Sequence, residues 1–372
     1  MKPRVLFVAR SRYRLPLSPS LRRKWDALAD ELDFRVLASG ADQGASNGVF
    51  RLVPPARVRA LDGVAFYGSL PSRVASELRR FDPEVVVAQS PYEAACALLA
   101  IAATRSRARL LLEVHGDWST AGRFYGSRAR LAISPLADRL AHLVVRRANA
   151  VRTVSPFTSG LVRRLDVEPA AVFTTFFDST AFDAPPAPLP DEPRALFVGV
   201  LERYKNVAGL AAAWPDVARR VPGARLQVIG RGRDTATVEQ LVGDLPGQVS
   251  WTSAVPPDEV AAALDDACVL VLPSFSEGLP RVAMEAFYRA RPVVASRAGG
   301  IPDIVVDGEN GLLVPPGDSG ALADALVRVL TDRALLERLA AGAAVSSARW
   351  RQSPEGFAAR MRAVVDETIA AP

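Results

Sequence analysis

The strongest constraint on the fold is an alternation, along the chain, of short apolar runs with longer amphipathic stretches. A short apolar run that ends in polar residues, such as 5–9, is typical of a strand buried on both faces. An amphipathic stretch that opens with a Ser-Pro pair, such as Ser18-Pro19, is typical of a helix. The alternation therefore predicts parallel sheets covered by helices. The expected strands are 5–9, 34–38, 49–53, 84–88, 109–115, 150–154, 195–199, 225–229, 249–251, 269–273 and 292–296. The expected helices begin at Ser18 and Ser155 and cover 67–80, 91–104, 128–147, 206–220, 235–242, 257–267, 280–289, 320–348 and 354–370.

The pattern runs twice, and a proline-rich stretch from Pro185 to Pro193 separates the two runs. At about 150 residues per domain, a chain of 372 residues is expected to hold two domains. We therefore predict an α/β fold of two doubly wound, Rossmann-like domains over residues 1–184 and 194–350, joined by a linker at 185–193. Two such domains imply a cleft between them, with ligands beyond the carboxyl ends of the strands.

Charge is distributed unevenly between the two halves. Residues 1–185 carry 27 Lys and Arg against 17 Asp and Glu, a net charge of +10. Residues 186–372 carry 19 against 23, a net charge of −4, and the two sums give the total of +6. This asymmetry predicts that the first half meets an anionic partner.

Several classes of protein are excluded by composition. The longest apolar stretch, 94–104, is shorter than the roughly 20 residues of a membrane span. The run at 5–8 is too short for the core of a signal peptide. Cys96 and Cys268 lie far apart in apolar runs, which argues against a disulfide framework or a zinc site. These features predict a cytoplasmic protein with buried free thiols.

The segment 273–285 combines the end of an expected strand with a glycine and two glutamates. Pro280 opens the next expected helix, and the free backbone N–H groups of a helix start form an anion site. Gly278 allows a phosphate to approach the backbone closely. Glu277 is placed to reach a sugar hydroxyl, and Glu285, on the second helical turn, a ribose hydroxyl. The alternative interpretation is a capped helix with two surface glutamates.

A second segment, 197–206, follows the first expected strand of the second half. Arg203 and Lys205 flank the start of the next helix, where two cations can neutralise a diphosphate. A solvated basic loop is the alternative.

Gly230-Arg231-Gly232 also follows a strand, but Thr235 stands where the dinucleotide fingerprint has its third glycine. It therefore supports a phosphate or nucleotide loop and not an NAD site.

Together these residues resemble the retaining nucleotide-sugar glycosyltransferases of the GT-B fold, of the family 4 (group 1) type. The E-x7-E motif of that family matches Glu277 and Glu285, and its G-x-L-x-x-x-K segment matches Gly199, Leu201 and Lys205. Segments 255–260 and 299–318 match further family signatures, and the likeness is strongest over about 190–330. In the first half, 115–117 resembles the family's histidine loop. The chain departs from the family where Val200 replaces a frequent Arg and 175–176 replaces an Asn-Gly pair.

The resemblance implies transfer of a hexose-type sugar from a UDP- or GDP-sugar to an acceptor hydroxyl, with retention of the anomeric configuration. It implies that neither a metal nor a cofactor is needed, and that a tail helix within 351–372 packs back on the first domain. Catalytic roles are implied for His115, Glu277, Arg203 and Lys205. The residues implied in donor binding are Gly199, Arg203, Lys205, Gly230, Val255, Glu277, Gly278, Leu279, Pro280 and Glu285.

The acceptor is expected in the first domain, near Arg10, Arg12, Tyr13 and Arg14. Together with Arg22, Arg23 and Lys24, the arginines form a basic face that suits a phosphorylated, lipid or cell-envelope glycan acceptor. It also suits an anionic membrane surface, so peripheral association with the inner face of the cell membrane is one expectation. A solvated basic face is the alternative interpretation.

Two other functions remain open at this point. A GT-B-fold epimerase or phosphorylase would use the same donor residues. A basic nucleic-acid-binding or anionic-membrane-binding protein would account for the isoelectric point of about 9.7. Nucleic acid is not expected, because the positive charge lies in the half without the motifs and no nucleic-acid-binding motif is present.

Overall fold

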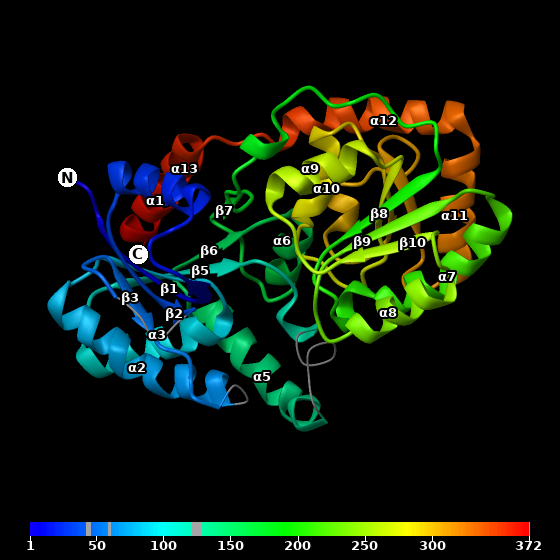
Figure 1. Cartoon of the computed structure of the whole chain (residues 1–372). Coiled ribbons are helices and arrows are strands. Elements are labelled where there is room, and N and C mark those ends of the chain that lie inside the picture. The colour runs from blue at the N-terminus through cyan, green and yellow to red at the C-terminus, as the bar shows by residue number, and fades with distance from the viewer. Residues whose placement is uncertain (42–45, 59–60, 121–127, 372) are drawn as a thin grey trace. The chain divides into compact units, whose positions relative to one another are not determined.

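A computed structural model describes residues 1–41, 46–58, 61–120 and 128–371 (Figure 1). Among these residues the chain forms two compact units. The first unit holds the residues up to Asp178 and those from Gln352 onward, and the second holds Ser179–Arg351. Each unit is built on one parallel β-sheet with helices on both faces, which confirms the α/β class expected from the alternation.

The sheet of the first unit has seven parallel strands in the order β3-β2-β1-β4-β5-β6-β7. The order reverses beside β1, which is the arrangement of a doubly wound fold. The last strand, β7, has two residues and was not expected from the sequence. The strands are β1 (Arg4–Tyr13), β2 (Asp33–Gly40), β3 (Phe50–Val53), β4 (Val85–Ala88), β5 (Arg109–Val114), β6 (Ala150–Thr153) and β7 (Ala171–Val172).

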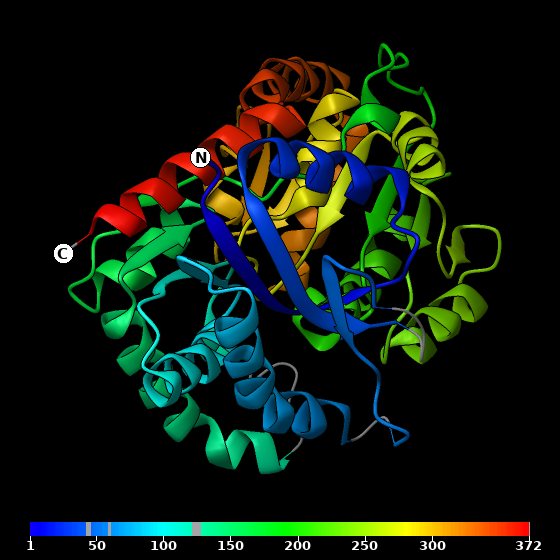
Figure 2. The same ribbon diagram turned by 90° about the vertical axis from the view of Figure 1, so that its left-hand side faces the viewer.

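Alternate residues of β1 enter two separate hydrophobic cores. Val5 and Phe7 join the core beneath α1 and α13, whereas Leu6 and Val8 join the core beneath α2, α3 and α5. Figures 1 and 2 show α13, the red C-terminal helix, beside the blue α1. The helices of this unit are α1 (Pro19–Glu31), α2 (Asp62–Arg80), α3 (Pro91–Thr104), α5 (Arg128–Arg147), α6 (Pro156–Arg163) and α13 (Pro354–Ala370).

Ser-Pro pairs begin helices in this unit, as the sequence predicts. The hydroxyl of Ser18 accepts a hydrogen bond from the Leu21 N–H at 3.4 Å, and that of Ser155 accepts one from Thr158 at 3.2 Å. Each serine therefore satisfies one N–H group that the helix leaves without a partner, and the proline after it has no N–H to satisfy.

The first strand differs from its prediction. We expected it to end at Ala9 and a loop to follow, but β1 continues to Tyr13. Its pairing with β2 shifts register between Val8 and Arg12, which is the signature of a β-bulge. The bulge therefore places Arg10 and Ser11 inside an irregular strand, and not in a loop.

The sheet of the second unit has six parallel strands in the order β10-β9-β8-β11-β12-β13. Relative to chain order this is the same reversal as in the first unit, here beside β8. The strands are β8 (Arg194–Val198), β9 (Arg225–Ile229), β10 (Val249–Thr252), β11 (Val269–Leu272), β12 (Val293–Ser296) and β13 (Gly311–Val314). The helices are α7 (Val207–Arg220), α8 (Thr235–Asp244), α9 (Pro257–Asp265), α10 (Arg281–Tyr288), α11 (Ser319–Thr331) and α12 (Arg333–Ser347), with 3-10 turns η2 (Thr180–Phe182), η3 (Arg203–Lys205), η4 (Ile301–Asp303) and η5 (Ala348–Trp350).

Two features of the second unit were not expected. The strand β13 was not predicted, and the helical region 320–348 is divided into α11 and α12. The division falls at Asp332, whose carboxylate accepts a hydrogen bond from the Leu335 N–H at 2.9 Å. An aspartate in this position caps a new helix, and this is the physical reason for the break.

The proline-rich stretch is held by arginines of the second unit. Arg291 is 1% exposed and donates hydrogen bonds to the carbonyls of Ala187 and Pro188, each at 3.0 Å. Arg289 donates to the carbonyl of Pro185 at 3.0 Å, and Arg333 to that of Pro190 at 2.8 Å. These bonds satisfy carbonyls that have no strand or helix partner.

In the described part of the chain we find no helix that combines the length and the apolarity of a membrane span.

Candidate functional site

In each unit, the reversal of strand order marks where a ligand is expected. At such a reversal the loops after two neighbouring strands separate and leave a crevice at the carboxyl edge of the sheet. In the second unit these are the loops after β8 and β11, and in the first unit the segments at the ends of β1 and β4.

In the second unit the reversal brings together two of the predicted catalytic residues. The Nζ of Lys205, on η3 after β8, lies 2.5 Å from the Oε1 of Glu277, in the loop after β11. The two side chains are 10% and 11% exposed. The hydroxyl of Ser274 donates a second hydrogen bond to the same oxygen at 2.9 Å. A buried pair with a further donor is a fixed arrangement, so the ammonium group is held in place before any ligand arrives.

Glycines make the close packing of these loops possible. A Cβ on Gly230 would lie 1.8 Å from the carbonyl oxygen of Gly199, and one on Gly232 would lie 2.2 Å from that of Leu201. A Cβ on Gly299, where φ is +54°, would lie 2.2 Å from the carbonyl oxygen of Glu277. The loops after β9 and β12 therefore support the backbones of the β8 and β11 loops. Backbone packing by itself accounts for the glycines of the Gly230-Arg231-Gly232 segment.

Glu285 lies on α10 and is 7% exposed. Its carboxylate accepts a bond from the Nε of Arg281 at 2.9 Å. Burial raises the pKa of Glu285, whereas the charges of Arg281 and Lys205 act in the opposite direction. The effect of Lys205 on this pKa places Glu285 within electrostatic reach of the Lys205–Glu277 pair.

The other residues predicted for donor binding surround the same edge of the sheet. Gly278, Leu279 and Pro280 lead into α10, and Val255 lies in the loop between β10 and α9. Arg203 is exposed on η3, and among the described residues its side chain has no ion pair. It is therefore a cation whose charge is not neutralised within the protein.

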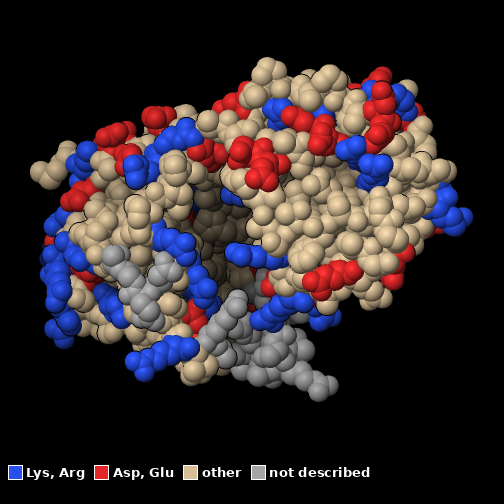
Figure 3. Space-filling view, in the orientation of Figure 1, with Lys and Arg blue, Asp and Glu red and all other residues tan. Residues whose placement is uncertain are grey.

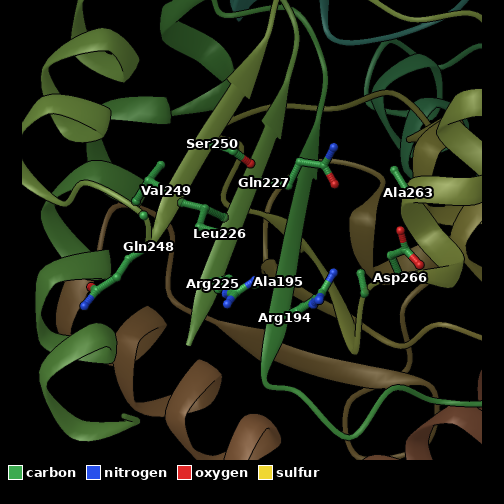
Figure 4. A pocket seen from close by; sticks show the side chains of 12 residues that line it. Arg194, Ala195, Arg225, Leu226, Gln227, Gln248, Val249, Ser250, Ala263 and Asp266 are labelled. Carbon is green, nitrogen blue, oxygen red and sulfur yellow. The ribbon is translucent and has the colours of Figure 1, made fainter. Parts of the chain in front are cut away.

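A cavity of about 240 Å³ opens at the opposite edge of the same sheet (Figure 4). Arg194, Arg225 and Val249, at the amino ends of three strands, contribute to its lining. None of the predicted site residues lines it, and it lies at the end of the sheet away from Lys205 and Glu277. In a parallel sheet the amino edge is not where ligands of this fold class bind.

In the first unit a cavity of about 610 Å³ lies at the reversal beside β1. It brings three of the four predicted acceptor residues, Arg10, Arg12 and Tyr13, together with His115, whereas Arg14 is exposed and does not line it. The complete lining is Arg10, Ser11, Arg12, Tyr13, Leu21, Lys24, Gln89, Glu93, His115, Thr175 and Phe176.

His115 follows β5 directly and is held at both ring nitrogens. Its Nε2 lies 3.2 Å from the Oε2 of Glu113, and its Nδ1 lies 3.2 Å from the Oγ1 of Thr175. Because an ionised carboxylate accepts hydrogen bonds only, Nε2 carries the proton in the neutral ring. The ring of His142, the second histidine of the sequence, packs against that of Trp118.

Glu113 and Arg152 form a buried ion pair that sequence reasoning missed. Glu113 Oε1 lies 2.5 Å from Arg152 Nη1, and Arg152 Nη2 also donates to the carbonyls of Phe173 and Thr174 at 2.9 and 3.0 Å. Burial would raise the pKa of Glu113, but the Arg152 guanidinium and the His115 ring outweigh it and bring the pKa to about 2. The sequence could have indicated this pair, because the apolar strand β5 contains one acidic residue and the apolar strand β6 contains a basic residue. The two residues are register partners.

Buried titratable groups also line the first-unit cavity. Burial lowers the pKa of Lys24 to about 8, although the Glu113 carboxylate acts in the opposite direction. Burial, followed by the Glu113 charge, raises the pKa of Tyr13 to about 12. The sequence analysis places Lys24 in the basic face of the first domain, and the structure places it in the lining of this cavity.

No cluster of three or more His, Cys, Asp or Glu that could hold a metal ion is found among the described residues.

Two sequence models of known families match the chain. Residues 192–332 match the model described as glycosyl transferases group 1, and residues 17–175 match the model described as a glycosyl transferase 4-like domain. Together they cover most of both units and contain Lys205, Glu277 and His115.

Individual relatives agree with these matches. A D-inositol 3-phosphate glycosyltransferase from Corynebacterium diphtheriae is 37% identical over 144 residues, which is 37% of this chain and 34% of that protein. The match therefore spans about a third of the relative's length. Among solved structures, sucrose-phosphate synthase from Thermosynechococcus elongatus superposes with a TM-score of 0.81 at 20% identity, covering 100% of both chains. Anabaena HepE, solved in complex with UDP, superposes with a TM-score of 0.68 at 17% identity, also over 100% of both chains. At these identities the two structures establish the GT-B fold alone.

Proposed function

Because the chain belongs to the group 1 glycosyltransferase family, we propose that it transfers a hexose-type sugar from a nucleoside diphosphate donor to an acceptor hydroxyl. The proposal includes retention of the anomeric configuration, no requirement for a metal ion, and UDP or GDP as the carrier. The single observation that carries it is the Lys205–Glu277 pair, which the fold holds at the carboxyl edge of the second sheet.

The diphosphate of the donor is assigned to Lys205 and Arg203. Lys205 is fixed by Glu277, so its ammonium group is already in place when negative charge develops on the leaving diphosphate. Fixed charges of this kind stabilise a transition state without reorganisation. Arg203, exposed on the same turn, adds a second cation. The backbone N–H groups at the start of α10, beside Gly278, Leu279 and Pro280, supply further donors.

The remainder of the donor is assigned to the neighbouring loops. Glu277 and Glu285 accept hydrogen bonds from hydroxyls of the transferred sugar and of the ribose. Following the family resemblance, Val255 is assigned to the nucleobase and Gly199 to the phosphates. Gly230 is assigned to the phosphates or the nucleoside because its glycine-containing loop follows a strand. HepE, a solved structure of the same fold, is described in complex with UDP, and this supports a uridine nucleotide as the first candidate.

His115 is assigned to the transferred sugar. With Nε2 bound to Glu113, its Nδ1 is the nitrogen available to a hydroxyl in the cavity or to Thr175. Its role is to hold a hydroxyl near the reacting carbon, while a donor phosphate oxygen takes the proton of the acceptor. Attack of the acceptor from the face that the diphosphate leaves would give retention.

The acceptor is assigned to the first-unit cavity that holds Arg10, Arg12 and Tyr13. The net charge of +10 on residues 1–185 supports a phosphorylated, lipid or cell-envelope glycan acceptor, and also peripheral contact with an anionic membrane. A relative named for D-inositol 3-phosphate supports the phosphorylated class.

A thermal-shift panel with UDP, GDP and ADP, each with a metal chelator present, tests donor binding. A ligand at 100 times its dissociation constant stabilises the folded state by about 2.7 kcal/mol, which is a readily measured shift in melting temperature. We expect a selective shift with one of the three nucleotides. If none of them shifts the melting temperature, the assignment of the second-unit site is wrong.

Product analysis tests the reaction. We expect the anomeric coupling constant in the NMR spectrum of the product to match that of the donor, and the His115→Ala variant to release nucleoside diphosphate more slowly. An inverted product would contradict retention. Conversion of the donor without an acceptor would indicate an epimerase, and dependence on free phosphate a phosphorylase.

A further inference from the structure

The cavity of the first unit carries an excess of positive charge. Three of its lining residues are cationic: Arg10, Arg12 and Lys24. Arg10 and Arg12 share one carboxylate, that of Asp62, at 3.7 and 2.7 Å. The three cations and the one shared carboxylate have a net charge of +2. Glu93 is the acidic residue of the lining, and the net charge is +1 if Glu93 is ionised. The excess is positive in either state of Glu93. Figure 3 shows that blue Lys and Arg side chains are also frequent on the surface of this unit.

Lys24 differs from the two arginines of this cavity because no carboxylate of the described residues forms an ion pair with it. Among the described residues, its amine has no ion pair and no hydrogen bond, and it lies over two aromatic rings instead. Its Nζ is 5.0 Å from the centre of the Trp25 ring and 5.3 Å from that of Phe357. A partly buried ammonium group that lies over aromatic faces without a hydrogen bond to the described residues lacks partners that it would have in water.

Two charged groups, Glu113 and Arg152, act on the pKa of Lys24, and they are paired with each other. Glu113 on β5 is bound by Arg152 at 2.5 Å and by His115 at 3.2 Å. Arg152 on β6 repels the Lys24 charge, and burial together with this repulsion keeps the pKa of the amine near 8. An anion in the cavity would reverse this effect, because a nearby negative charge favours the protonated amine.

We propose that this cavity binds a phosphate ester, and that Lys24 is a binding residue for the phosphate. The inference rests on the proposed function, for which it names the class of acceptor: a hydroxylated molecule that carries a phosphate group. Three separate donors, Arg10 and Arg12 on β1 and Lys24 on α1, match the three terminal oxygens of a phosphate monoester better than the two oxygens of a carboxylate. Ser11, Gln89 and Thr175 provide neutral polar groups for hydroxyls in the same cavity.

The small number of lysines makes a direct test possible. The chain contains three, namely Lys2, Lys24 and Lys205. Protein labelled with ¹³C at the ε-carbon of lysine should give three signals, which single Lys→Arg variants assign. We expect glucose 6-phosphate to move the Lys24 signal and raise its titration midpoint, and glucose at the same concentration to leave both unchanged. UDP should move the Lys205 signal, so the donor site and the phosphate-ester site are tested separately in one sample.

Two variants show whether Lys24 binds the phosphate group or only packs against neighbouring side chains. Lys24→Met keeps most of the apolar stem, and we expect it to weaken glucose 6-phosphate binding by about 10- to 100-fold, since it removes one charge-assisted hydrogen bond. Lys24→Arg should retain part of the affinity. Lys2→Met is the matched control, because Lys2 is exposed and donates to the Ala29 carbonyl outside the cavity, and it should bind as the wild type does.

Vesicles distinguish a lipid headgroup from a soluble ester. Movement of the Lys24 signal by vesicles that contain phosphatidic acid, whose headgroup is a phosphate monoester, but not by phosphatidylcholine vesicles would identify a lipid phosphate, and movement by glucose 6-phosphate a soluble one. Either result supports the proposal. If neither probe moves the Lys24 signal while UDP moves that of Lys205, the proposal is overturned and the donor site stands. Equal effects of glucose and glucose 6-phosphate would also overturn it.

Discussion

Each unit buries one acid–base pair near the carboxyl edge of its sheet, but the two pairs differ in position and in burial. Glu113 and Arg152 are register partners on adjacent strands, and their side chains are 5% and 1% exposed. Lys205 and Glu277 lie on loops beyond the strands, and their side chains are 10% and 11% exposed. The first pair is enclosed by protein, whereas the second stands where the strand order reverses and a ligand is expected.

The comparison shows how to distinguish an ion pair that stabilises the fold from one that takes part in the reaction, although each pair consists of one acidic and one basic residue. The Nη2 group of Arg152 donates to two backbone carbonyls, and Glu113 also contacts His115, so the first pair holds the sheet and His115 in place. In the second pair, the loop glycines hold the backbone around Lys205 and Glu277, and the charged groups themselves remain close to the surface. We therefore expect damage to the first pair to affect stability, and damage to the second to affect nucleotide chemistry.

The largest effect is expected from Glu113→Gln. This variant leaves the Arg152 guanidinium buried without a counter-charge, and breaking such a pair costs about 3–5 kcal/mol of unfolding free energy. Chemical denaturation monitored by circular dichroism measures it. The double variant Glu113→Leu with Arg152→Met should recover much of the loss. A single variant as stable as the wild type would show that the first pair is not a scaffold.

Lys205→Ala should lower the rate of nucleoside diphosphate release about 10²- to 10³-fold, because one fixed positive charge is lost from the leaving group. Lys205→Ala also leaves the Glu277 carboxylate without its partner cation, so the melting temperature of the variant should fall. Adding Glu277→Gln should restore the melting temperature but not the rate. Recovery of the rate in the double variant would contradict the assigned role.

Lowering the pH should reduce the free energy of unfolding through the first pair, Glu113 and Arg152. The pKa of Glu113 is about 2 in the folded protein, below the ordinary value of 4.5. A depressed carboxyl pKa contributes stability that is present above about pH 4.5 and is lost as the pH falls towards 2, here roughly 3 kcal/mol. Unfolding free energies measured between pH 5 and pH 2 test this, and Glu113→Gln should show a shallower dependence. An equally steep dependence in the variant would assign the acid sensitivity to other carboxylates.

The smallest effect is expected from Gly299→Ala. Its φ of +54° and the contact of a new Cβ with the Glu277 carbonyl should cost about 1–3 kcal/mol and weaken nucleotide binding. Gly243→Ala is the control, because nothing lies within 4 Å of its Cβ position and it stands inside α8. That variant should be neutral or slightly more stable. Equal behaviour of the two variants would show that the β12 loop does not support Glu277.

Much of the fold could be predicted from the sequence, because its local signals agree with its tertiary structure. The expected bounds of α3, α5 and α13 match the structure, since proline or a charged run marks their ends. The break between α11 and α12 was missed although its cause, the Asp332 cap, is local, whereas the errors in the strands had tertiary causes. The bulge that extends β1 to Tyr13 depends on pairing with β2, and the short strands β7 and β13 form only as edges of completed sheets.

The candidate site divides in the same way. Lys205, Glu277 and Glu285 were identified because their spacing resembles a family motif that is local in sequence. Glu113 with Arg152, and Lys24 with the first-unit cavity, depend on strand register and on how α1 packs. No motif records those arrangements. The sequence therefore did not predict the Glu113–Arg152 pair, and it placed Lys24 in a basic face near the acceptor without placing it in this cavity.

Calorimetric titration of UDP and GDP into the wild type, Lys205→Met and Lys24→Met tests the central claim most directly. The claim is that the loop pair of the second unit, Lys205 with Glu277, forms the nucleotide site. We predict that Lys205→Met weakens binding of the preferred nucleotide about tenfold or more, while Lys24→Met binds it as the wild type does. Undiminished affinity in a folded Lys205→Met protein, or an equal loss in Lys24→Met, would contradict it.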